Sequence, residues 1–322
     1  MSLTLADVQV TMTDDIDFNN IDEARKSSFV LDRMSFENTV SPDTNGGTLT
    51  TGYTRTITER AADTRQENTE YPAREARKQK YTVDLIPLGA RYNVDRVYAG
   101  LGDATTNQVV FQQAEARKAT IAKFHDLFIN GVAADFAQAV PEFDGLDKIV
   151  TGTTTESFAT GTTPWDFDTI TDKAGAMAAK RALTSWLRSF YRKPDVIFAN
   201  EDGIAWLEQI ADWIGFYTET KNAWGESIDN FRGIPFIDLG EKDGSSDPII
   251  TTSGTGTTSL YGVCFGTDSV HGYSVNGSQI LKQWLPDFSV AGAVKPGEVE
   301  LGPVAIAAKR TKGVGAFRVD VQ

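Results

Sequence analysis

The chain has 322 residues, 40% of them hydrophobic and 23% charged, so it is long enough for two domains and too apolar to be disordered over most of its length. It carries 31 Lys and Arg against 44 Asp and Glu, a formal net charge of −13. That charge excludes a protein that coats nucleic acid with a basic surface, but not a container that encloses it. The single cysteine, Cys264, excludes a disulfide framework and a multi-cysteine zinc site.

Residues 1–48 are predicted to form an amino-terminal arm. The first 24 residues carry six acids and no base, and the arm closes in the turn-forming stretch 41–47. Residues 21–34 favour one short helix. The amino terminus lacks the basic start and apolar stretch of a secretory signal, and no uncharged run is long enough to span a bilayer. We therefore expect a soluble protein made in the cytoplasm of its producing cell.

Residues 49–98 are predicted to form a long two-stranded excursion. Alternating runs at 48–58 and 80–86 indicate two strands, while residues 54–81 hold seven bases, five acids and few apolar side chains. An isolated hairpin is marginal in water. The segment is therefore either a disordered surface loop or an arm that becomes ordered on a neighbouring copy, and the mixed charges favour the second. The residues expected to contact the neighbour are Arg55, Arg60, Arg65, Glu67, Arg74, Arg77 and Lys78.

A long helix is predicted between Asp103 and Asn130. Asp103 and the threonines after it provide a start, and Asn130-Gly131 provides a left-handed stop. Some 25 residues at ~1.5 Å rise make a rod of roughly 38 Å, which suits a strut. Its apolar side chains recur near helical spacing. The residues expected in its core are Val110, Ile121, Phe124 and Phe128.

From residue 165 onward, helices and strands alternate. A helix is expected over 168–191, a buried strand over 196–199, and a second helix that begins at Asn200. Residues 212–229 are predicted to form an aromatic loop. Its aromatic side chains are Trp213, Phe216, Tyr217 and Trp224. Short strands are expected over 233–240, 259–265 and 272–275. The chain ends in two strands, 299–308 and 314–321, which we expect to form an antiparallel pair.

Nothing in the sequence supports catalysis. The two histidines, His125 and His271, are far apart and lack a His-x-x-x-His spacing, so a structural role is favoured over metal binding. No Gly-x-Ser-x-Gly elbow and no phosphate-binding Gly-x-x-x-x-Gly-Lys loop occurs. We expect no catalytic, cofactor-binding or metal-binding residues.

The order of these elements resembles the major capsid protein of tailed bacteriophages, whose Hong Kong 97-type fold is also used by encapsulin nanocompartments. Three stretches carry the resemblance. The long helix runs through 115–131 and is followed by Phe143-Asp144-Gly145-Leu146. Residues 194–200 are similar to a strand-to-helix turn of the family's axial domain, and residues 231–237 are similar to the strand after its axial loop.

The resemblance implies an α+β chain with the family's domain plan. The amino-terminal arm is 1–48, and 49–98 is the E-loop, which reaches over an adjacent subunit. The peripheral domain, 99–150 with 285–322, surrounds the long spine helix. The axial α/β domain is 151–284, with its aromatic loop near a five- or six-fold axis.

The resemblance also implies the function. The chain would self-assemble as hexamers and pentamers into an icosahedral shell around double-stranded DNA, without sequence-specific binding, enzymatic activity or a membrane. Because only about 48 residues precede the hairpin, we expect a separate scaffolding protein. A portal is a further expected partner, with a decoration protein as an open option. The shell would be assembled in the host cytoplasm and belong to the virion. Lys78 and Lys80 lie in the loop that some members crosslink, but no acceptor is recognisable.

Three alternatives stay open. The same fold could form an encapsulin-type compartment around an enzyme, although the acidic arm and long hairpin favour a virus. The α/β lobe could belong to an enzyme that depends on His125 or His271. The chain could also be another phage structural part, such as a tail protein.

Overall fold

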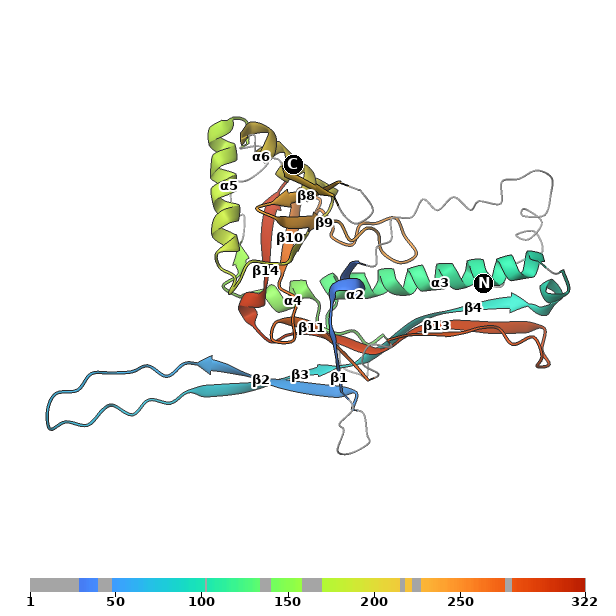
Figure 1. The fold of residues 1–322 in the computed structure, drawn as a ribbon, viewed down its shortest axis with the longest axis horizontal. Helices are drawn as coiled ribbons and strands as arrows, with labels where there is room; N and C mark the ends of the chain where they lie inside the picture. The colour runs from blue at the N-terminus through green and yellow to red at the C-terminus, as the bar shows by residue number, and fades with distance from the viewer. Residues whose placement is uncertain are drawn as a thin grey trace.

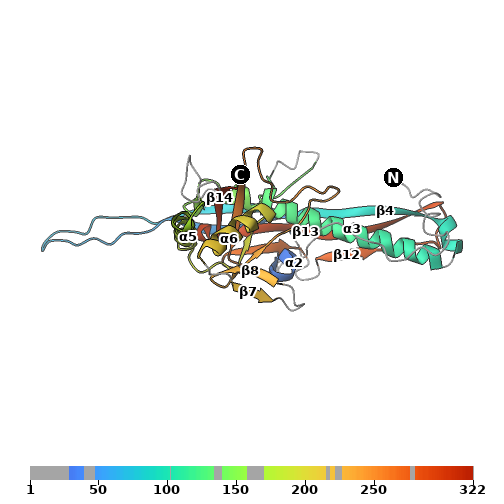
Figure 2. The same ribbon diagram turned by 90° about the horizontal axis from the view of Figure 1, so that it is seen from above.

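In the computed structural model, the chain forms a long flat body, a lobe that stands upright at one end of this body, and a hairpin that projects from the body (Figure 1). Helix α3 (Asp103–Asn130) lies along strands β4 and β13 in the body, and helices α5 and α6 belong to the lobe. Figure 2 shows the hairpin and the far end of α3 pointing in opposite directions. The structure describes residues 29–39, 48–101, 103–133, 140–157, 170–214, 218–221, 227–275 and 280–321.

The lobe is built on a seven-stranded sheet of order β5-β14-β10-β6-β9-β8-β7. Its strands are β5 (Glu156–Ser157), β6 (Val196–Phe198), β7 (Thr218–Lys221), β8 (Ser227–Phe231), β9 (Ile234–Ile237), β10 (Thr257–Val263) and β14 (Val314–Asp320). Its helices are α5 (Lys173–Leu187) and α6 (Glu201–Ile214). As expected for the strand-to-helix turn, the Asn200 Oδ1 atom accepts a hydrogen bond of 3.0 Å from the Gly203 amide and caps α6.

The central strands of this sheet are buried on both faces. Successive side chains of a strand point to opposite sides, and in β10 Leu260 packs with α5 and α6 while Tyr261 and Val263 pack toward the end of α3. In β14, Phe317 likewise packs with α5 and α6, whereas Ala316 packs toward the end of α3. The lobe is therefore attached to the body through one face of its own sheet.

A polar junction reinforces this attachment. The Arg318 guanidinium donates hydrogen bonds to Asp147, Glu156 and Ser259 at 2.8–3.0 Å. Asp147 belongs to the short helix α4 (Leu146–Val150), and it also accepts the Tyr261 hydroxyl at 2.8 Å. One guanidinium thus joins α4, β5, β10 and β14.

The body contains a five-stranded sheet around β13 (Val294–Ala308). At ~3.3 Å per residue, its 15 residues span roughly 50 Å. β13 pairs with β11 and β12 on one side and with β4 on the other, and β1 pairs with β11. The remaining strands are β1 (Phe36–Asn38), β4 (Ile86–Asp95), β11 (Val270–Ser274) and β12 (Leu281–Trp284). Three short helices complete the body: α2 (Phe29–Arg33), η1 (Arg96–Leu101) and η3 (Thr311–Gly313).

The predicted pairing of the last two strands is wrong. β13 lies in the five-stranded sheet and β14 in the seven-stranded sheet, where β14 pairs antiparallel with β10. The turn η3 between them carries the chain from the body into the lobe. The last strand is therefore part of the lobe, not of the region around the spine helix.

The segment after the hairpin also differs from the predicted E-loop range of 49–98. The hairpin ends at Asp84, and the next strand, β4, pairs with β13 along nearly its whole length. Residues 86–95 therefore belong to the body under α3.

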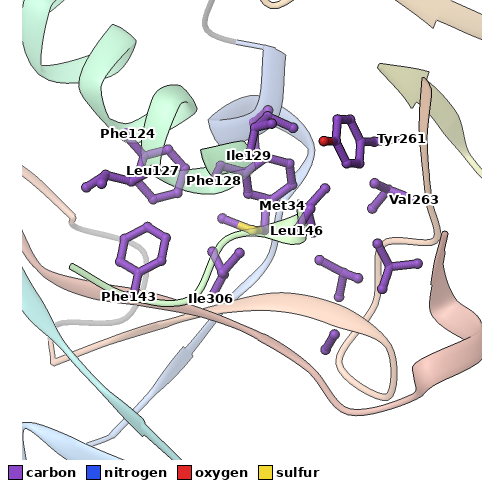
Figure 3. Packing of buried hydrophobic residues seen from close by; sticks show 14 of the residues in the cluster. Met34, Phe124, Leu127, Phe128, Ile129, Phe143, Leu146, Tyr261, Val263 and Ile306 are labelled. Atoms are coloured by element: carbon purple, nitrogen blue, oxygen red, sulfur yellow. The ribbon is translucent and has the colours of Figure 1, made fainter. Parts of the chain in front are cut away.

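The spine helix α3 has 28 residues, about 42 Å, and its carboxyl-terminal part enters the main core. Phe124 and Phe128 are fully buried and pack with Phe143 and Leu146 (Figure 3). Ile121 is only partly buried. The prediction that Val110 belongs to the core is wrong, because its side chain is 57% exposed. The buried Gln108 is two residues away, which is about 200° around a helix.

Shortening a side chain to alanine should destabilise the fold much more at the carboxyl-terminal end of α3 than near its amino-terminal end. We expect Phe128→Ala to lower the free energy of unfolding by about 3–5 kcal/mol, because it leaves a cavity among other buried rings. Val110→Ala on the same helix serves as the control, with an expected change within about 0.5 kcal/mol. Urea unfolding of the unassembled subunit measures both. Equal losses at the two positions would contradict the burial described here.

Candidate assembly surfaces

The hairpin is the most prominent surface feature of the chain (Figure 1). Among the described residues, strands β2 (Thr50–Thr58) and β3 (Arg77–Asp84) pair only with each other, and residues 59–76 between them contain no helix or strand. In β2, Thr51, Tyr53 and Arg55 are partly buried, and the residues after Arg55 are exposed. The hairpin thus has packing partners at its base and almost none farther out.

The base of the hairpin is fastened to the body by Tyr53 and Arg55. The Arg55 guanidinium donates to the carbonyl oxygens of Ala308 and Lys309 at 2.7 and 2.9 Å, and the Tyr53 hydroxyl donates to Ala308 at 3.1 Å. Arg55 also lies over the Tyr81 ring at 4.6 Å. Arg55, which we expected to contact a neighbouring subunit, therefore binds its own chain at the end of β13.

Farther out, the hairpin is stabilised by contacts within itself. Arg74 donates to Asp63 at 2.9 Å, and Arg65 lies over the Tyr71 ring at 5.3 Å. Exposed charged side chains cover the rest of the hairpin surface. The other predicted contact residues, Arg60, Glu67, Arg77 and Lys78, are all exposed. Their role in contacts between subunits stays a prediction.

The described part of the amino-terminal arm is held on the body by a charged contact that the sequence analysis did not anticipate. β1 pairs in parallel with β11, and Glu37 on β1 accepts Lys309 at 3.0 Å. The Glu37 carboxylate also lies 3.4 Å from His271 Nε2. A Cβ atom at Gly272 would come within 2.3 Å of the Phe36 ring, so this close approach requires glycine. Residues 1–28 and 40–47 of the predicted arm lie outside the described residues.

Both histidines are buried inside the fold. Burial lowers the pKa of His125 to about 4. The pKa of His271 is also lowered, first by burial and then by Lys309, against the opposing influence of Glu37. Neither ring nitrogen of His125 has a hydrogen-bond partner among the described residues. Neutral, inaccessible rings suit packing rather than proton transfer.

The described residues include only part of the predicted aromatic loop, 212–229. Trp213, at the end of α6, is 44% exposed. Phe216, Tyr217 and Trp224 lie outside the described residues, so their place near a symmetry axis stays a prediction. The prediction that 212–229 is a loop is wrong in part, because α6 continues to Ile214 and strands β7 and β8, which begin inside this range, pair with each other at the outer edge of the seven-stranded sheet.

The described residues offer little for catalysis or metal binding. Within them, no group of three or more His, Cys, Asp or Glu side chains is arranged to hold a metal ion. Burial raises the pKa of the Cys264 thiol to about 12, which keeps it protonated and unreactive. No helix in the described part of the chain has the length and apolar character needed to cross a membrane.

Comparisons with known proteins find similarity in structure and none in sequence. No family model matches the sequence, and no curated protein matches it. The capsid of Myoviridae phage XM1 is similar with a TM-score of 0.58 and 11% identity, covering 95% of this chain and 96% of that chain. The holo-SrpI encapsulin complex from Synechococcus elongatus PCC 7942 gives a TM-score of 0.56 and 12% identity, covering 99% and 96%.

A structure of Mycobacterium phage Bobi is similar with a TM-score of 0.56 and 14% identity, covering 99% of both chains. Because these similarities extend over nearly the whole chain, they include the hairpin, the spine helix and the lobe together. The chain has the Hong Kong 97-type α+β fold of phage capsid and encapsulin subunits.

The buried His125 predicts that stability depends on pH. The folded-state pKa of about 4 is below the usual histidine value of 6.5, so between these values the unfolded chain binds a proton that the folded chain excludes. Stability is therefore complete above about pH 6.5 and falls as the pH drops toward 4, by up to about 1.4 kcal/mol per pH unit. In urea titrations of the unassembled subunit, His125→Leu should flatten this slope. His271 stays in place as an internal reference, and an unchanged slope would contradict the prediction.

The anchor at the hairpin base predicts a local effect of Arg55→Ala. Loss of its charge-assisted hydrogen bonds, at about 1.5–3 kcal/mol, should make amide hydrogen exchange in β2 and β3 at least about tenfold faster, since ~1.4 kcal/mol is a factor of ten. Lys78→Ala on the exposed part of the same hairpin is the matched control. Equal exchange rates in the two variants would show that Arg55 does not hold the hairpin.

Proposed function

We propose that this chain is the major capsid protein of a tailed bacteriophage. It assembles as hexamers and pentamers into an icosahedral shell that encloses double-stranded DNA. The observation that carries the proposal is that a shell-subunit fold is matched over nearly the full chain, with a hairpin that projects beyond its own core. The chain acts as a structural protein and needs no cofactor.

The hairpin gives the physical reason for assembly. A two-stranded ribbon is marginally stable in water unless something packs on it. Here the body contacts the base of the hairpin and leaves the outer part exposed. A neighbouring copy supplies the missing surface, and because hairpin and receiving surface are different parts of the chain, the contact is head-to-tail. Contacts of that kind close into rings when the rotation allows it.

The charge of the chain suits a container for DNA. A net charge of −13 disfavours non-specific adhesion of nucleic acid to the wall, since that adhesion depends on neutralising phosphates with Lys and Arg. The DNA is then held by enclosure and not by sequence-specific contacts. The proposal extends to a separate scaffolding protein and a portal as partners, with a decoration protein as an open option, to assembly in the host cytoplasm, and to a final place in the virion.

An encapsulin-type compartment is the second candidate. The observation in its favour is that the encapsulin complex is as similar to this chain as the phage structures are, with 99% of the chain covered. The two functions differ in cargo, which is nucleic acid in one and protein in the other.

The test is the assembly state and content of the purified chain. Size-exclusion chromatography with light scattering, followed by electron microscopy, should show closed shells or ring-shaped capsomers. Absorbance spectra before and after nuclease and protease treatment of disrupted particles identify the cargo. A stable lone monomer at high concentration in the presence of co-expressed scaffolding and portal proteins would contradict the proposed function.

Removal of the hairpin tip should separate folding from assembly. We expect replacement of residues 59–76 by an Asn-Gly turn, which suits a two-residue hairpin, to leave the thermal unfolding midpoint of the subunit within a few degrees of the original. The same replacement should abolish shell formation, as seen by light scattering. Intact shells from the shortened chain would exclude an assembly role for the tip.

A further inference from the structure

Two neighbouring helices of the lobe carry opposite charges. Residues 173–194, which include α5, contain six bases and no acid, whereas residues 195–219, which include α6, contain six acids and no base. The hairpin segment 54–81, in contrast, mixes seven bases with five acids. α5 and α6 pack against each other on one face of the seven-stranded sheet (Figure 1). The lobe therefore presents a basic and an acidic helix side by side.

The bases of α5 lie on its outer face. At about 100° per residue, Lys173, Met177, Arg181 and Arg188 fall within a sector of roughly 80°, and all four are exposed. We call these four residues the basic stripe. The buried side of the helix lies opposite and faces the sheet. Its residues are Ala176, Ala179, Leu183 and Trp186.

The acids of α6 form a matching stripe. Glu201, Glu208 and Asp212 fall within roughly 40° of one another around the helix, and all three are exposed. We call them the acidic stripe. Trp206, Leu207 and Ile210 occupy the opposite, buried side. Each stripe is thus held outward by the apolar packing of its own helix.

The spacing of the charges is similar in the two stripes. Arg181 and Arg188 are separated by two turns of α5, and Glu201 and Glu208 are separated by two turns of α6, about 10.5 Å in each case. Within the described residues, none of Arg181, Arg188, Glu208 and Asp212 has an ion-pair partner within 4.0 Å. Other arginines of the lobe are occupied, as Arg192 is by Asp195 at 2.7 Å.

We propose that the acidic stripe of one copy docks on the basic stripe of the next copy within a capsomer. This inference rests on the proposed function and names the residues through which the lobes meet. Because the acidic stripe of one copy meets a different part of the next copy, its basic stripe, the contact is head-to-tail, and a rotation can repeat it around an axis. Complementary charges of this kind steer encounter and set the register of docking. The exposed Met177 and Trp213, 50% and 44% accessible, add apolar surface to the contact.

A second copy explains these stripes better than nucleic acid does. Phosphates would account for the bases of α5, but Glu208 and Asp212 on the neighbouring helix would repel them. A copy of the same lobe satisfies both stripes at once.

Charge reversal tests the proposal. In Arg181→Glu/Arg188→Glu and in Glu208→Arg/Asp212→Arg, like charges face each other between copies. Each double variant should raise the protein concentration needed for assembly at least tenfold, as measured by light scattering. In the variant that carries all four substitutions, acidic and basic side chains face each other again between copies, so assembly should be restored. It keeps the original net charge and serves as the matched control. Circular dichroism melting of unassembled subunits should give the same midpoint for all variants.

Two results would overturn the inference. If the wild-type chain forms shells and both double variants assemble equally well, the stripes do not meet, while the proposed shell function stands. If the α5 variant forms normal shells that lack nucleic acid, the basic stripe binds phosphates instead of a second copy. Absence of assembly in the wild-type chain counts against the proposed function, and the double variants are then compared for dimer formation by sedimentation, where equal association would also overturn the inference.

Discussion

The burial of β10 and β14 on both faces is the constraint on which the rest of the structure depends. When a strand carries apolar side chains on both faces of its sheet, other elements of the fold must cover both faces. One cover is the helical layer of α5 and α6, and the other is the end of the spine helix with α4. The lobe and the body therefore share one sheet face, and Arg318 joins them at the same place through Asp147 and Glu156.

This arrangement decides which surfaces are left for other molecules. The inward faces of α5 and α6 are used by the lobe, so their charged residues point outward. The core at the end of α3 is filled by aromatic rings such as Phe124, Phe128 and Phe143, and the hairpin is attached beside it through Arg55. Each protruding part thus begins at a well-packed core and extends away from it. A subunit of this design is stable locally and incomplete at its edges, which suits assembly from many copies.

The end of β13 is where the arm and the hairpin both attach. Lys309 binds Glu37 of the arm through its ammonium group, while its carbonyl oxygen accepts Arg55 of the hairpin. Ala308 beside it accepts Arg55 and Tyr53. Lys309 therefore contacts two segments that are distant in sequence, immediately before the chain turns into the lobe.

The sequence by itself determined the elements whose signals are local. The long helix, the strand and capped helix around Asn200, and the paired strands of the charged hairpin all follow from periodicity and from cap residues. The left-handed stop predicted at Asn130-Gly131 is wrong, because neither residue has a positive φ. Gly131 is required there by the close approach of the Phe143 carbonyl oxygen, which leaves no room for a Cβ atom. Tertiary structure alone decided which sheet each strand joins, since β4, which pairs with β13, and β10, which pairs with β14, are far from these strands in sequence and hydrophobic alternation does not specify the pairing. It also decided that Val110 is exposed and that Arg55 binds its own chain. Helical spacing shows that a face exists but not what lies against it, and a charge shows that a partner is needed but not where the fold brings one.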